Sequence, residues 1–85
     1  MIHKTEIENY KGTLEELATE LGDLRYDALA DFLEHLSKKI ALDGSKDRAR
    51  GRKKLATCLE NTSSLLAESS VEIEKAWEIC EPYMD

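Results

Sequence analysis

The sequence contains few of the residues that build sheets, disulfide frameworks or membrane spans. Its 85 residues include one proline and four glycines, too few turn residues for a many-stranded sheet. Nowhere do ~18 apolar residues run together, as a membrane span requires. The stretch 1–12 carries charges among its few apolar residues, so we expect no signal peptide. These absences favour a cytoplasmic protein without a membrane segment.

Cysteine is also scarce. Cys58 and Cys80 lie far apart, with no CxxC pair between them, which argues against a disulfide framework or a zinc knuckle. We expect two buried free thiols and no metal or other cofactor.

The composition that remains is that of a small helical domain. The chain is 41% apolar and 35% charged, which is too apolar for intrinsic disorder. A domain of this length buries only ~60–65% of its unfolded surface, so its stability is marginal unless it associates or packs very regularly. We therefore expect an all-α fold in one domain, 1–85, and help from a partner.

Local signals divide the chain into helices. Residues 1–12 form either an extended arm or an extra helical turn. Thr13 and Glu16 make a capping box, which predicts a first helix over 13–22 that ends at Gly22. Apolar residues at steps of three and four predict a second helix over 23–42.

A turn is predicted at 43–45, where Asp-Gly-Ser offers a glycine for positive φ and a serine to cap the next helix. A 4-3 apolar repeat then predicts a helical segment over 45–84, either continuous or kinked near Ser69. The expected architecture is a small helical bundle built on a long antiparallel hairpin with a shorter N-terminal helix.

A turn centred on Gly44 sets the expected register of this hairpin. Opposed residue numbers sum to about 88, which pairs Leu33 with Leu55 and Leu29 with Leu59. Gly51 lies either on the inner face, permitting close approach, or in an exposed first turn that it weakens by ~1 kcal/mol.

Two helices cannot cover all of the large apolar side chains. The first helix folds over them in a compact monomer, or a second copy covers them in a homodimeric four-helix bundle, which we favour. The candidate apolar interface is Phe32, Leu36, Leu66, Ile73 and Trp77.

The most unusual feature is a basic block in an acidic chain. Residues 38–54 carry a net charge of +6, whereas 1–37 and 55–85 each carry −6. The candidate contacts for an anion or a partner are Lys46, Arg48, Arg50, Arg52, Lys53 and Lys54. They suit an acidic protein partner, a second copy or nucleic acid, but no aromatic residue interleaves them to stack a base. The alternative is a solvated or internally paired surface.

Recognisable chemistry is absent from the sequence. Asp31 and His35 form an i, i+4 pair of the kind common on helix surfaces, with no nucleophile nearby in sequence. Residues 43–54 resemble a calcium loop only superficially, because Arg48 and Lys54 replace its glycine and bidentate glutamate. We expect a non-enzymatic interaction or regulatory module that self-associates and has no small-molecule substrate. The alternative is polyanion binding through 46–54.

Overall fold

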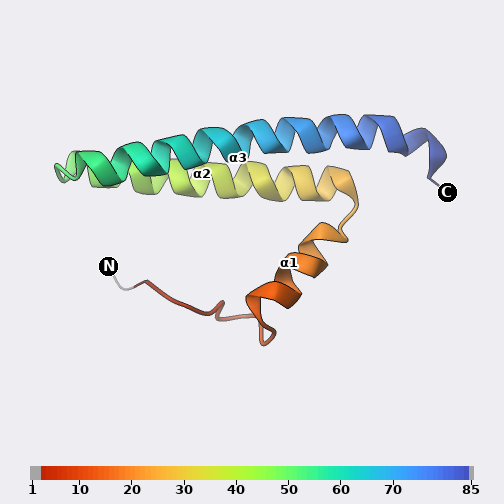
Figure 1. The fold of residues 1–85 in the computed structure, drawn as a ribbon, viewed down its shortest axis with the longest axis horizontal. Helices are drawn as coiled ribbons and strands as arrows, with labels where there is room; N and C mark the ends of the chain where they lie inside the picture. Colours follow the sequence, from red (N-terminus) through yellow and green to blue (C-terminus); the bar gives the residue numbers. More distant parts are fainter. Residues whose placement is uncertain (1–2, 85) are drawn as a thin grey trace.

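A computed structural model describes residues 3–84 and shows an all-α chain. Its helices are α1 (Leu14–Gly22), α2 (Tyr26–Ala49) and α3 (Lys53–Cys80), followed by a 3-10 turn, η1 (Glu81–Tyr83). Helices α2 and α3 lie antiparallel in a long hairpin, and α1 crosses beside it (Figure 1). The predicted fold class, a hairpin with a short N-terminal helix, is confirmed.

Helix α1 begins and ends where the local signals place it. The Thr13 hydroxyl accepts a hydrogen bond from the Glu16 backbone N–H at 3.1 Å, and the Glu16 carboxylate accepts one from the Thr13 N–H at 3.1 Å. These reciprocal bonds satisfy backbone donors that the first helical turn leaves unpaired. The hydrogen bonds to Thr13 also lower the pKa of the Glu16 carboxyl. The helix stops at Gly22, as predicted.

The hairpin turn is not where the sequence predicted it. Helix α2 continues through 43–45 to Ala49, and α3 starts only at Lys53, so the predicted helix ends at 42 and 45 are wrong. Asp43 does not end the helix; its carboxylate forms an ion pair at 2.7 Å with Lys39, one helical turn earlier. A side chain at position 44 would point into the hairpin. The close helix packing that glycine permits there offsets its low helix propensity.

Gly51 makes the actual turn. Its φ is +80°, a left-handed conformation that costs other residues ~1–2 kcal/mol. The Gly51 N–H bonds to the Arg48 carbonyl at 3.0 Å, and the Arg52 N–H bonds to the Asp47 carbonyl at 2.9 Å. This is the Schellman pattern that ends many helices. Neither role predicted for Gly51 is therefore correct, because it lies between the helices.

Replacing Gly51 by alanine should lower the free energy of unfolding by ~1 kcal/mol, because alanine disfavours positive φ. Thermal unfolding followed by circular dichroism measures the loss. Gly22→Ala is the matched control, since Gly22 has no positive φ and a Cβ there would meet no other group within 4 Å. Equal melting temperatures for the two variants would contradict the assigned turn.

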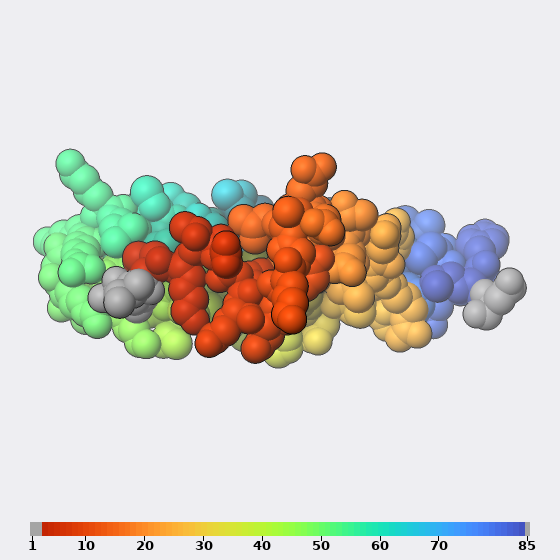
Figure 2. Space-filling model, turned by 90° about the horizontal axis from the view of Figure 1, so that it is seen from below, coloured from red at the N-terminus to blue at the C-terminus, as the bar shows by residue number. Residues whose placement is uncertain are grey.

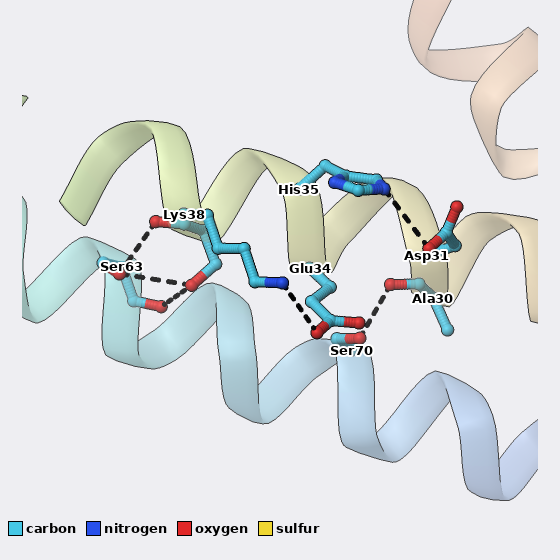
Figure 3. Close-up of polar contacts among 8 residues, drawn as sticks. Ala30, Asp31, Glu34, His35, Lys38, Ser63 and Ser70 are labelled. Atoms are coloured by element: carbon cyan, nitrogen blue, oxygen red, sulfur yellow. Dashed lines mark hydrogen bonds and ion pairs between the residues drawn. The ribbon is translucent and has the colours of Figure 1, made fainter. Parts of the chain in front are cut away.

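Small residues form the seam of the hairpin. Gly44 lies against Ala56, and a Cβ added to Gly44 would be 3.6 Å from the Ala56 carbonyl. The Ser37 hydroxyl lies 3.2 Å from that of Ser63 and donates to the Ser63 carbonyl at 2.8 Å. The Ser70 hydroxyl donates to the Ala30 carbonyl at 2.7 Å. Figure 3 shows the serine contacts across the seam.

These contacts fix the register of α2 against α3. Opposed residue numbers sum to 100 at Gly44 and Ala56, at Ser37 and Ser63, and at Ala30 and Ser70. The predicted sum of 88, with its leucine pairs, is wrong because the turn lies at Gly51. Small residues recur at intervals of seven on both helices, which lets the two backbones approach closely.

The arm before α1 is tied to that helix by one hydrogen bond. The Tyr10 hydroxyl donates to a Glu20 carboxylate oxygen at 2.5 Å. This bond, followed by burial and the Glu20 charge, raises the pKa of Tyr10 to about 12 from its ordinary value of 10.0. A raised pKa means that the contact stabilises the fold fully below pH ~10 and that this contribution is lost as the pH rises through ~12.

The phenolate absorbance of a Tyr26→Phe, Tyr83→Phe variant should therefore rise near pH 12. Adding Glu20→Gln should move that transition toward pH ~10, because the carboxylate that favours the neutral phenol is gone. A transition near pH 10 in the presence of Glu20 would show that the arm is not held in this way.

Candidate functional site

Nine large apolar side chains of α2 and α3 lie to one side of the seam. At ~100° per residue, Leu36 is displaced from Ser37 on α2 in the same sense as Leu66 is displaced from Ser63 on α3. Because the helices are antiparallel, equal senses of rotation place both residues on the same side of the hairpin. Ile40 of α2 and Leu59 of α3 line one hollow there. We call this surface the apolar face. Its residues are Leu29, Phe32, Leu36, Ile40, Leu55, Leu59, Leu66, Ile73 and Trp77.

The apolar face is covered only in part. Among residues 3–84 the only buried apolar residues with a side chain are Ala30 and Ala56, and no large side chain is fully buried. Phe32 is 37% exposed. The other four predicted interface residues (Leu36, Leu66, Ile73 and Trp77) are half-buried. All five lie on one surface, and whether a partner contacts them stays a prediction.

Residues 3–22 lie over this surface without sealing it. The arm and α1 extend across the hairpin in Figure 2, and His3 lines the hollow with Ile40 and Leu59. Leu14 of α1 remains 63% exposed. Extensive contact between helices within the described residues is confined to α2 and α3. The short helix therefore leaves the large apolar side chains partly accessible to water.

Trp77 has a cationic neighbour at the open end of the hairpin. The Arg25 guanidinium carbon lies 5.1 Å from the centre of the Trp77 ring, within the range of a cation–π interaction. Two hydrogen bonds of 2.7 and 2.8 Å hold the same guanidinium on Asp27 and lower the pKa of that carboxyl. Arg25 thus covers one edge of the apolar face.

The opposite side of the seam is acidic. A shallow groove there is lined by Asp27, Asp31 and Glu34 of α2 and by Glu74 of α3. His35 lies 3.4 Å from Asp31, with both side chains more than two-thirds exposed, and Lys38 lies 3.3 Å from Glu34. These are the i, i+4 surface pairs drawn in Figure 3. The predicted Asp31–His35 pair is such a surface contact.

The basic residues gather at the turn between α2 and α3. We call Lys46, Arg48, Arg50, Arg52, Lys53 and Lys54 the basic tip. Lys46 and Arg48 belong to the last turn of α2, where positive charge interacts favourably with the negative end of the helix dipole. Lys53 and Lys54 belong to the first turn of α3, where positive charge is unfavourable because this end of the helix dipole is itself positive. The uncapped start of α3 and its two lysines leave positive charge at the tip.

Only two members of the basic tip have a carboxylate partner among residues 3–84. Arg48 donates two hydrogen bonds to Glu60, at 2.8 and 2.7 Å, and lowers the pKa of that carboxyl. Arg52 lies 3.3 Å from Asp47. The sequence did not reveal Glu60 as a partner, because the pair joins two helices in a register set by Gly51. Lys46, Arg50, Lys53 and Lys54 make no ion pair with the described residues.

The two cysteines differ in their exposure. Cys58 is exposed and Cys80 is half-buried, so the expectation of two buried thiols is wrong; Cys58 lies outside the seam. Within residues 3–84, no three His, Cys, Asp or Glu side chains are grouped to hold a metal ion. A search of the same residues finds no helix long and apolar enough to cross a bilayer.

Comparisons with known proteins returned no relationship: no family model matches the chain, and neither a curated protein nor a solved structure resembles it significantly. The functional argument therefore depends on the two surfaces described above.

Proposed function

We propose that this protein is a non-enzymatic helical interaction module that self-associates through the apolar face. The observation that carries this proposal is the exposed area. The chain exposes 6938 Å², whereas a compact monomer of 9.6 kDa exposes about 5,100 Å². The excess of about 1,800 Å² is comparable to the area that one subunit buries in a large obligate interface.

The shape supports the same proposal. The radius of gyration is 15.4 Å and the dimensions are 51 × 29 × 14 Å, against a radius of about 12 Å for a compact domain of this length. These dimensions include residues 3–22, which cover the apolar face only in part and so form an incomplete second layer. A second copy, packed face to face, supplies that layer and completes a four-helix arrangement.

The second copy must share this face with residues 3–22, or take their place. Their contacts with α2 and α3 are limited, and residues 23–25 form the short connection between α1 and α2. Within this connection, Arg25 is bonded to Asp27 and lies over Trp77 of the hairpin, so a displaced α1 would move relative to Arg25. A second hairpin offers far more apolar area than the nine-residue α1.

Recovery of an untagged copy with a tagged one tests this function. Both copies are co-expressed, and the tagged copy is captured at low and at high salt. We expect untagged chain in both eluates, because apolar burial does not weaken with salt. Loss of the untagged copy at both salt concentrations would exclude self-association. Capture that disappears only at high salt would favour contacts made by the basic tip, such as those with an acidic protein partner.

Polyanion binding is the second candidate function. It is supported by the four cations of the basic tip that have no carboxylate partner among residues 3–84. Asp43 and Asp47 line the same hollow as Lys46 and Arg50, which weakens the attraction for phosphates. Binding of a single-stranded oligonucleotide should then fall steeply with salt and disappear in Arg50→Glu, Lys53→Glu, Lys54→Glu. Absence of binding by the unaltered chain at low salt would eliminate this function.

The cellular setting is part of the proposal. Two free thiols, one of them exposed, suit the reducing cytoplasm, which is where we propose that the module acts.

A further inference from the structure

The apolar face runs along the whole hairpin, so burial alone does not decide how a second copy is oriented. Leu55 lies next to the turn and Trp77 near the open end of α3. Two copies related by a twofold axis can place their turns at the same end or at opposite ends. Both orientations bring apolar side chains together, and the distribution of charge distinguishes them.

The two ends of the hairpin carry opposite charge. Residues 46–54 hold six cations and Asp47, a net charge of +5. Residues 68–81, toward the open end of α3, hold five glutamates and Lys75, a net charge of −4. Four tip cations have no ion pair with residues 3–84, and Asp43 and Asp47 in the hollow beside them offset their charge only in part.

The tip cations also border the surface that the second copy would cover. Lys46, Arg50 and Arg52 line the hollow that contains Ile40 and Leu55. Copies packed with their turns together would bring two basic tips to one end of the interface, where like charges repel within a Debye length of ~8–10 Å. Copies packed with turns at opposite ends bring each basic tip toward the acidic end of the other copy.

We propose, on the basis of the self-association proposed above, that two copies pack antiparallel, with the basic tip of each beside the open, acidic end of the other. The dimer is then isologous, with its twofold axis across the middle of the hairpins near Ser37 and Ser63. Electrostatic complementarity sets the orientation, and apolar burial supplies most of the affinity.

The distance between the two Cys80 residues of a dimer tests this orientation. Cys80 is half-buried at the last position of α3, and Cys58→Ser leaves it as the single site for a spin label. At 1.5 Å per residue, Cys80 lies about 25 Å along α3 from Ser63. Antiparallel copies therefore place the two labels about 40–50 Å apart, whereas copies with their turns together place them within about 25 Å.

Pulsed electron paramagnetic resonance measures this distance on the labelled full chain, after light scattering has verified its mass. A main distance of about 40–50 Å supports the antiparallel dimer. A dimer with a main distance below about 25 Å overturns the orientation but leaves the proposed self-association intact. A labelled and an unlabelled chain that are both monomeric would overturn both proposals.

Charge reversal provides an independent test that needs no label. Lys46→Glu, Arg50→Glu, Lys53→Glu, Lys54→Glu should weaken the dimer at least tenfold at low salt, with a smaller difference at high salt, because it places two acidic ends together. Lys38→Glu, Lys39→Glu is the control, because it changes the charge in the same direction at two cations of α2 outside the basic tip, and it should have less effect. A dimer equally tight in the tip variant and the unaltered chain would contradict the role of charge.

Discussion

Phe32→Glu should convert the proposed dimer into a monomer, with the dissociation constant raised at least a hundredfold. The Phe32 side chain is 37% exposed in the single chain and lies beside the small-residue seam rather than in it. In the proposed dimer it would be buried, and burial of a Phe contributes ~1.5–3 kcal/mol. Each dimer carries the substitution twice, and an unpaired carboxylate is costly to bury. Sedimentation equilibrium over a concentration series measures the dissociation constants of the variant and of the unaltered chain.

Leu42→Glu is the matched control for this prediction. Leu42 is also an exposed large apolar residue of α2, at 52%, but it faces away from the apolar face. We expect this variant to keep the dimer and both variants to keep the helical content of the unaltered chain. If both variants dissociate equally, or neither does, the apolar face is not the interface.

Ala56→Glu should unfold the hairpin, with a loss of at least ~4 kcal/mol in the free energy of unfolding. Ala56 is fully buried and lies opposite Gly44. The helices are so close here that a Cβ added to Gly44 would lie 3.4 Å from the Leu59 Cβ. A glutamate here must separate the helices or bury a charge without a partner. Small domains have only ~0.05–0.15 kcal/mol of stability per residue, so few would tolerate this loss.

The same substitution at an exposed position isolates the effect of the seam. Ala28 lies on the outer side of α2 in its first turn, where an acidic residue interacts favourably with the positive end of the helix dipole. Circular dichroism at a fixed chain concentration should show a melting temperature near that of the unaltered chain for Ala28→Glu, and at least ~20 °C lower for Ala56→Glu. Similar melting temperatures for the two would contradict the close contact between α2 and α3.

The sequence predicted the helices better than the turn between them. The Thr13–Glu16 capping box and Gly22 place α1 because their signals are local. Two glycines competed for the turn, and Asp43-Gly44-Ser45 carries stronger turn chemistry than Arg50-Gly51-Arg52. Packing across the hairpin decides between the two glycines, because Gly44 must lack a side chain for the helices to approach closely at Ala56.

A signal for the seam was nevertheless present in the sequence. Small residues recur at intervals of seven, as Ala30, Ser37 and Gly44 in α2 and as Ala56, Ser63 and Ser70 in α3. An interpretation centred on leucines overlooks them and assigns the leucines to the seam. Correcting the register moves the leucines to one side, where they strengthen the case for a partner.

The candidate contacts were predicted as a set, but their pairing was not. The five apolar interface residues share one surface because helical periodicity survives an error in the turn. Arg48 is different, since its partner Glu60 lies 12 residues away and is recognisable only once the turn is placed. Pairing of this kind depends on tertiary structure and cannot be deduced from the charge block alone.

The most direct test of self-association is the mass of the chain in solution. Light scattering after size exclusion, across a concentration series and at low and high salt, should give twice 9.6 kDa at micromolar concentration, with the dimer persisting at high salt. A mass of 9.6 kDa at every concentration and salt would contradict the account, and would mean that the apolar face stays uncovered by a second copy.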